Sequence, residues 1–229
     1  MTDGPQARAL EIATSRAGSF VYETARFLIH NILYRMFRLV TSGEQHLDTE
    51  GPLVIAPVHR SNLDAPLVAA LAKRPYKSLA KESLFSPAPL GWVMSALGGF
   101  PVERGAADRE ALKAAQELLD AGEAIIVFPE GTRQTGTSVG EVFDGAAFLA
   151  ARTGAKVVPV GIAGTEAAMP PGAKFPRRSK VAIVVGEPID PPDTGGKRLS
   201  LSKRREYTAQ LAERLQDVFD EARIEAEQV

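Results

Sequence analysis

A histidine and an aspartate stand five residues apart in the stretch VHRSNLDAP, residues 58–66. His59 directly follows the apolar run LVIAPV, and Asp64 lies where we expect the first turn of the following helix. If Asp64 accepts a hydrogen bond from Nδ1–H of His59, it fixes the imidazole tautomer and leaves Nε2 as an oriented general base. Such a base contributes roughly 10²–10⁴-fold to a reaction rate. The alternative is a loop histidine beside an aspartate that only supplies negative charge at a helix start.

A second group of polar residues follows another apolar run, in AIIVFPEGTR, residues 124–133. Glu130 and Arg133 stand at the end of this run, where burying a charge is costly unless something requires it. A third stretch, GGFPVERG, contains Arg104. A guanidinium can bind phosphate through two parallel hydrogen bonds, so Arg104 and Arg133 are candidates for holding an anionic substrate. Each could instead be a solvated loop charge.

The elements around these residues predict an α/β fold, because short apolar runs alternate with helical patterns after residue 43. Ligand sites of open α/β sheets gather at the carboxyl ends of strands, which is where this pattern places His59. Ser61 or Asn62 is the expected N-cap of the helix that follows it. We expect strands over residues 53–58, 77–80, 124–128, 156–162 and 180–185, and helices over 108–120, 144–153 and from 202 onward.

The composition is that of a globular protein, with 45% hydrophobic and 24% charged residues among 229. A net charge of −1 argues against wholesale nucleic-acid binding. The chain has no cysteine, which excludes disulfides, thiolate nucleophiles and cysteine-ligated zinc. Its three histidines are too scattered to predict a metal site. We divide the chain into an N-terminal helical segment for membrane association, residues 1–43, and an α/β domain, residues 44–229.

The most apolar segment, residues 20–40, has the pattern of an amphipathic helix. At 100° per residue its charged side chains form one stripe: Glu23, Arg26, Arg35 and Arg38. The wide apolar remainder includes Phe27, Leu33 and Phe37. A broad apolar face with arginines opposite is typical of a helix at a membrane interface. The alternative is a helix docked on the protein's own core, and the two could apply to different faces.

Four ordered motifs resemble those of the glycerolipid acyltransferase family, in particular its bacterial 1-acylglycerol-3-phosphate acyltransferases. The resemblance covers about residues 45–190. The motifs are HRSNLD at 59–64, GFPVER at 99–104, FPEGTR at 128–133 and VPV at 158–160. The His-x4-Asp spacing alone would be a weak signal, whereas four motifs in this order are a specific one.

The resemblance implies a central mixed β-sheet flanked by helices, as in glycerol-3-phosphate acyltransferases. It also implies transfer of an acyl group from acyl-CoA or acyl carrier protein to a lysophospholipid hydroxyl. The expected acceptor is 1-acylglycerol 3-phosphate (lysophosphatidic acid), the product is phosphatidic acid, and no cofactor is needed beyond acyl-CoA as co-substrate. The reaction would take place at the cytoplasmic face of the cell membrane. By resemblance, the catalytic residues are His59 and Asp64, and the substrate-binding residues are Lys81, Arg104, Glu130, Gly131, Thr132 and Arg133.

Two other functions fit the same motifs. One is a non-catalytic lipid-binding module of the same fold, which would be expected to lose His59 or Asp64. The other is a hydrolase in which His59 activates water. The absence of cysteine and of a GxSxG elbow favours direct attack without an acyl-enzyme. Backbone N–H groups near Gly131 are candidate donors to the negative charge that develops during the reaction.

Overall fold

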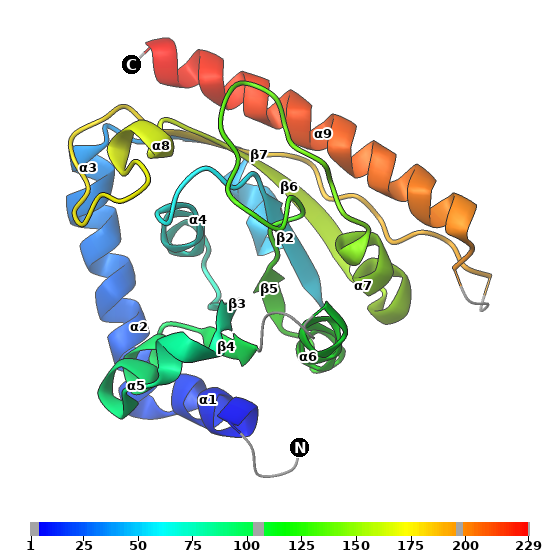
Figure 1. The fold of residues 1–229 in the computed structure, drawn as a ribbon, viewed down its shortest axis with the longest axis horizontal. Helices are drawn as coiled ribbons and strands as arrows, with labels where there is room; N and C mark the ends of the chain where they lie inside the picture. Colours follow the sequence, from blue (N-terminus) through cyan, green and yellow to red (C-terminus); the bar gives the residue numbers. More distant parts are fainter. Residues whose placement is uncertain (1–4, 103–107, 196–198, 229) are drawn as a thin grey trace.

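A mixed β-sheet forms the centre of the molecule (Figure 1). The computed structural model describes residues 5–102, 108–195 and 199–228. The strands are β1 (Val40–Ser42), β2 (Leu53–Pro57), β3 (Tyr76–Lys81), β4 (Gly99–Val102), β5 (Ala124–Ile126), β6 (Lys156–Ala163) and β7 (Ala182–Val185). They lie in the order β1-β7-β6-β2-β5-β3-β4. The strands from β6 to β4 are parallel, whereas β7 is antiparallel to β6 and parallel to β1. The predicted fold class is therefore confirmed.

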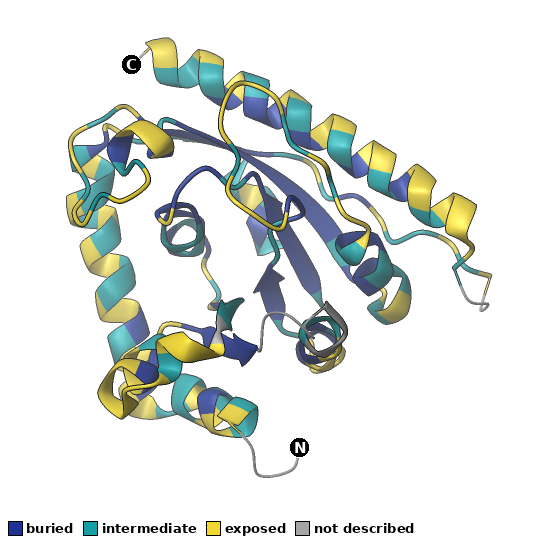
Figure 2. Ribbon diagram, in the orientation of Figure 1, coloured by how far each residue is buried: buried dark blue, intermediate teal, exposed yellow. Residues whose placement is uncertain are grey.

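Strand β2 has an uninterrupted apolar sequence, which suits its place inside the sheet between β5 and β6. Successive side chains of a strand point to opposite faces. Leu53 and Ile55 accordingly pack into one hydrophobic core, while Val54 and Ala56 pack into a second. The central strands are buried along their length (Figure 2). Packing against both cores fixes the position of β2, and with it the position of His59 just after the end of the strand.

Helices cover both faces of the sheet. The longer ones are α4 (Asp64–Leu71), α5 (Ala88–Ala96), α6 (Asp108–Asp120), α7 (Gly145–Thr153) and α9 (Leu201–Gln228), and the shorter ones are η2 (Glu44–Asp48), η3 (Glu82–Phe85) and α8 (Thr165–Ala168). The long helix α9 runs along one side of the molecule (Figure 1) and contributes Leu211 to one core and Leu215 to the other. Gly161 in β6 allows this close packing, because a Cβ there would lie 2.0 Å from the carbonyl oxygen of Val218.

The N-terminal segment forms a helical arm beside the sheet (Figure 1). It consists of α1 (Pro5–Thr14), α2 (Arg16–Leu28), a π-helical turn η1 (Ile29–Leu33) and α3 (Tyr34–Met36). The helix predicted over residues 20–40 thus begins earlier and ends at Met36, and Val40 already belongs to β1. Among the described residues, no helix combines the length and apolar character that crossing a membrane requires.

The apolar side chains of this arm point in two directions, so an exposed apolar face and a core-docked face are both present. Phe27 is 65% exposed, whereas Phe37 is fully buried and Leu33 packs against the core. The π turn explains the difference. It inserts one residue into the helix and so rotates everything after it by about 100° relative to a regular α-helical pattern. Core docking is therefore correct for one face, while an apolar face that includes Phe27 remains exposed.

The five predicted strands are present with shifted ends, and the structure adds β1 and β4, which the sequence pattern does not predict. Both are edge strands. β1 has three residues and β4 contains Pro101, so neither carries the alternation by which strands are recognised. Because β1 pairs with β7, the N-terminal segment contributes to the sheet. The domain boundary after residue 43 stays a prediction.

Candidate active site

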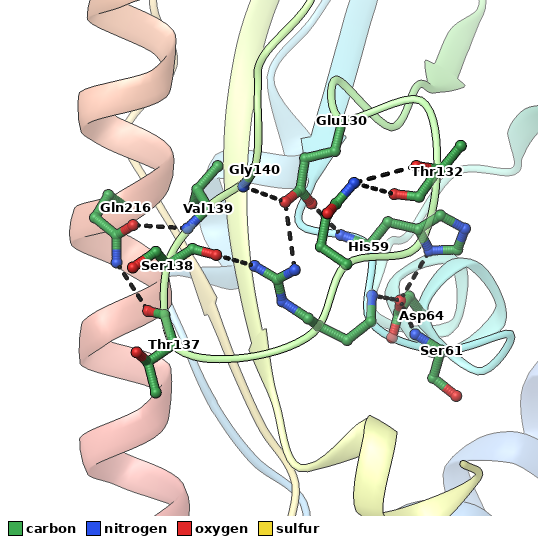
Figure 3. Close-up of polar contacts among 12 residues, drawn as sticks. His59, Ser61, Asp64, Glu130, Thr132, Thr137, Ser138, Val139, Gly140 and Gln216 are labelled. Atoms are coloured by element: carbon green, nitrogen blue, oxygen red, sulfur yellow. Dashed lines mark hydrogen bonds and ion pairs between the residues drawn. The ribbon is translucent and has the colours of Figure 1, made fainter. Parts of the chain in front are cut away.

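His59 and Asp64 meet beyond the carboxyl end of β2 (Figure 3). Nδ1 of His59 lies 3.0 Å from Oδ2 of Asp64. Asp64 is fully buried in the first turn of α4, while the His59 side chain remains 19% exposed. Among the described residues, Nε2 of His59 has no hydrogen-bond partner. One ring nitrogen is thus held by the protein and the other is available to a substrate.

Asp64 is fixed by four donors. Its Oδ2 accepts the backbone N–H groups of Arg60 at 2.6 Å and Ser61 at 2.7 Å, in addition to the contact with His59. Its Oδ1 accepts the hydroxyl of Thr165 at 2.7 Å. Thr165 is fully buried at the start of α8, just after β6. Thr165 is not recognisable from the sequence pattern, because only the fold brings this threonine to the aspartate.

The predicted N-cap by Ser61 or Asn62 is wrong. Helix α4 begins at Asp64 with Leu63 in the cap position, and no side chain of the described residues makes a cap hydrogen bond there. The Asp64 carboxylate instead takes up the free N–H groups of the preceding loop. The hydroxyl of Ser61 donates to the carbonyl of Met169 at 3.1 Å, which ties this loop to the segment after α8.

Glu130 joins the second motif to the first (Figure 3). It is buried, and its Oε2 accepts the backbone N–H of His59 at 2.7 Å. Its Oε1 accepts the N–H of Gly140 at 2.8 Å and lies 3.3 Å from Nη1 of Arg60. Both carboxylate oxygens are therefore occupied within the protein. The predicted contact of Glu130 with substrate stays a prediction, and its observed contacts are with the loops that carry His59.

Arg60 is a buried charge directly after His59, to which the sequence pattern assigns no role. Its guanidinium pairs with Glu130, donates to the carbonyl of Ser138 at 3.1 Å and lies 4.5 Å from the ring centre of Phe219. Phe219 belongs to α9, so this one side chain links the histidine loop, the loop after Glu130 and the long helix. Its position directly after His59 is the only signal of this role in the sequence.

The turn after Glu130 lies against the histidine. The N–H of Gln134 donates to the carbonyl of His59 at 2.8 Å, and the ring of Phe128 stacks on the imidazole at 3.9 Å between centres. Three predicted substrate-binding residues are exposed in this turn: Gly131, Thr132 and Arg133. The N–H groups of Gly131 and Thr132 already donate to backbone carbonyls. They are therefore not free donors to a developing negative charge in this structure.

The other predicted site residues lie on the neighbouring strands. Lys81 is the last residue of β3, paired with Val102 of the parallel strand β4. This places the backbone of Lys81 at the same edge of the sheet as the histidine loop. Arg104 lies outside the described residues. The fourth motif belongs to β6, where Pro159 and Val160 pair with the end of β2 and support the strand that precedes His59.

Fold and site together define an α/β protein that presents a histidine–aspartate pair at the carboxyl edge of a mixed sheet. A family described as Acyltransferase matches residues 38–163, more than half of the chain. The chain therefore belongs to the acyltransferase family.

Named relatives agree with this assignment. The chain is 32% identical over 161 residues to the chloroplastic 1-acyl-sn-glycerol-3-phosphate acyltransferase LPAT1 of Arabidopsis thaliana, with 69% of this chain and 45% of that protein covered. It is 28% identical over 153 residues to the 1-acyl-sn-glycerol-3-phosphate acyltransferase of Bacillus subtilis (strain 168), covering 66% and 73%. The chain spans about half the length of the plant and algal relatives that it matches.

A solved structure is also similar. The crystal structure of the 1-acyl-sn-glycerophosphate (LPA) acyltransferase PlsC from Thermotoga maritima superposes with a TM-score of 0.69 at 26% identity. The match covers 92% of this chain and 86% of that one. The similarity thus extends over nearly the whole fold described above.

Proposed function

We propose that this protein is a 1-acylglycerol-3-phosphate O-acyltransferase, which moves a fatty acyl group from acyl-CoA or acyl carrier protein to the free hydroxyl of lysophosphatidic acid. The observation that carries the proposal is the buried Asp64 holding Nδ1 of His59 at 3.0 Å while Nε2 is left for a substrate. The names of the relatives support the choice of acceptor.

In the proposed mechanism, Nε2 of His59 removes the proton from the acceptor hydroxyl. The oxygen attacks the thioester carbonyl and forms the new C–O bond, after which the C–S bond breaks and the leaving thiolate takes the proton from Nε2. Asp64 keeps the imidazole oriented and stabilises its positive charge between these two proton transfers. The reaction needs no covalent intermediate on the protein, in keeping with a chain that contains no cysteine.

We assign the phosphate of the acceptor to the exposed turn that holds Gly131, Thr132 and Arg133. Arg133 lies next to Gln134, which is bonded to the His59 backbone, and it has no hydrogen-bond or ion-pair partner among the described residues. A guanidinium in the turn that is bonded to the His59 backbone suits a phosphate on the carbon next to the reacting hydroxyl of the acceptor. By resemblance to the family, Lys81 and Arg104 are further candidates for binding this phosphate.

We also propose that the enzyme works at the cytoplasmic surface of a membrane, because lysophosphatidic acid and acyl-CoA are both amphiphiles that partition into membranes. The exposed phenylalanines of α2, Phe20 and Phe27, would enter the lipid. Each apolar side chain buried in this way contributes about 1.5–3 kcal/mol. The helical arm would therefore hold the protein peripherally.

Product analysis with acyl-CoA and lysophosphatidic acid tests this proposal. The expected product is a new diacyl lipid, whereas free fatty acid would indicate a hydrolase and no product a binding module. His59→Ala should lower the rate by roughly 10²–10⁴-fold without lowering the melting temperature. His46→Ala is the matched control, because His46 lies outside the site, with its ring 3.1 Å from the Val185 carbonyl. A folded His59→Ala variant that transfers acyl groups at the normal rate would refute the mechanism.

A further inference from the structure

A cavity of about 710 Å³ lies between the end of α3 and the segment that leads from α8 to β7. None of the described residues that line it belongs to the site around His59. The two walls lie side by side in Figure 1 and are joined by backbone hydrogen bonds, from Val181 N–H to the Phe37 carbonyl and from Val40 N–H to the Val181 carbonyl, each 3.1 Å long. We call this cavity the basic groove.

Four positive charges line the basic groove: Arg35, Arg38, Arg178 and Lys180. None of the described lining residues is acidic. Within the described part of the chain, these four side chains make no hydrogen bond or ion pair, and all four are exposed. Like charges that line one cavity without counter-charges repel each other, so a bound anion would stabilise them.

The walls are held in place by the fold rather than by these side chains. Gly164, with φ +86°, allows the second wall to approach, because a Cβ there would lie 1.9 Å from the Lys180 carbonyl oxygen. The hydroxyl of Ser179 donates to the Gly164 carbonyl at 3.3 Å, and Nε of Arg177 donates to that of Ala167 at 2.8 Å. Arg178 and Lys180 are therefore carried on a segment with fixed backbone contacts.

The backbone of the wall formed by the end of α3 is irregular at the groove. Among the described residues, Arg38 is the only one other than glycine with a positive φ, at 45°. It follows the helix end in the left-handed position where glycine is preferred. An unfavourable residue kept at such a position points to a use for its side chain. The π turn contributes Asn31 and Ile32 to the same groove, and such turns often mark functional sites.

A simpler explanation would be that basic residues complement the negative end of the helix dipole. It could account for Arg35 and Arg38, which stand at the end of α3. It does not account for Arg178 and Lys180, which come from a different segment and complete the same cavity.

Exposed apolar side chains border the charges. Ile32 lines the groove and is exposed, and the segment that carries Arg178 also carries Phe175, which is 82% exposed. A basic cavity beside protruding apolar side chains matches the two parts of a lipid, a charged headgroup and its hydrocarbon chains. An acidic protein partner would satisfy the charges but gives no reason for isolated apolar side chains standing in solvent.

We propose that the basic groove binds the phosphate group of an anionic phospholipid of the membrane surface. Two arginines in different walls can each form paired hydrogen bonds to phosphate oxygens, while Ile32 and Phe175 contact the lipid chains. This lipid site is separate from the proposed active site, and it binds a lipid whether or not that lipid is a substrate of the proposed reaction.

The experiment measures binding of the full chain to vesicles of phosphatidylcholine with and without phosphatidylglycerol. Arg178→Ala with Lys180→Ala removes charge from one wall, and Arg38→Gly removes charge from the other. The double variant should bind anionic vesicles roughly ten- to thirtyfold more weakly, and Arg38→Gly about fivefold more weakly. Arg38→Gly should also melt about 2–4 °C higher, because glycine suits the left-handed backbone. Arg205→Ala with Arg214→Ala, on the exposed side of α9, is the control with the same charge change.

Loss of binding in both groove variants but not in the control, and only on anionic vesicles, is the result that we expect. Normal binding by either folded groove variant would overturn the proposal, as would a loss of the same size on pure phosphatidylcholine. A groove variant that binds vesicles normally but no longer binds acyl carrier protein would assign the groove to an acidic protein instead. Acyl transfer to lysophosphatidic acid in detergent micelles is measured separately, so a failure of the proposed reaction is distinguishable from a failure of this site.

Discussion

At the scale of single residues, the site depends on how completely one buried carboxylate is satisfied. Asp64 accepts hydrogen bonds from two backbone N–H groups, the His59 ring and the Thr165 hydroxyl. A carboxylate held by so many donors cannot rotate away from the imidazole. Thr165 does not reach the reacting atoms itself, and we regard it as a positioning residue.

Replacing Thr165 by valine keeps its shape and removes the hydroxyl. We expect kcat to fall by roughly tenfold, since one hydrogen bond to a charged group is worth about 1.5–3 kcal/mol and only part of this reaches the transition state. KM for either substrate should stay unchanged, and Thr165→Ser should restore kcat. Steady-state kinetics of the three proteins provides the check. A valine variant with normal kcat would show that Thr165 only fills space.

The residues of the site differ in how far the sequence reveals them. The His59–Asp64 contact is predictable because it lies within one loop and one helical turn. The roles of Arg60, Glu130 and Thr165 are not, because their partners come from distant segments that only the sheet brings together. The N-cap prediction failed because the helix begins later than the polar residues suggest, at Asp64 with Leu63 in the cap position.

At the scale of elements, the helical arm has one apolar face in solvent and one against the core, and a regular helical pattern does not distinguish them. Its exposed face includes Phe20 and Phe27, whereas Leu33 faces the core. A sequence pattern read at 100° per residue assumes a regular helix, and the π turn breaks that assumption. The short edge strands β1 and β4 were missed because their sequences contain little alternation.

The two faces of the arm can be tested separately. Phe20→Asp with Phe27→Asp should weaken binding to anionic vesicles by more than about tenfold, because two apolar side chains no longer enter the lipid. The melting temperature should stay close to that of the wild type. Leu33→Asp, by contrast, should lower the melting temperature, because it places a charge against the core. Vesicle sedimentation and thermal unfolding distinguish the two results, and a double phenylalanine variant that unfolds would place that face inside the protein.

At the scale of the whole molecule, α9 holds the two cores together. Leu211 belongs to one core, and Leu215 and Phe219 belong to the other. The apolar runs predict which strands form, and the spacing of these leucines predicts the helix. The order of the strands and the reversal of β7 are not predictable in this way, because several of the strands are short apolar runs that could each occupy more than one place in a sheet.

Leu215→Ala should lower the free energy of unfolding by about 2–5 kcal/mol, since it leaves a cavity at a fully buried position. Ile224→Ala on the same helix is the control, because Ile224 is exposed and its truncation should have little effect. Denaturant unfolding of both variants provides the measurement. Equal effects would contradict the packing of α9 described here.

The position of β2 inside the sheet has a consequence for how the chain is made. Both strands that pair with β2 come much later in the sequence. Ribosomes add roughly 5–20 residues per second, so the apolar stretch LVIAP leaves the ribosome several seconds before its partners exist. During that interval its backbone hydrogen-bonding groups and both of its faces are free to pair with another nascent chain. The strand that precedes His59 is therefore open to pairing with other chains during synthesis, and a chaperone that covers it would prevent such pairing.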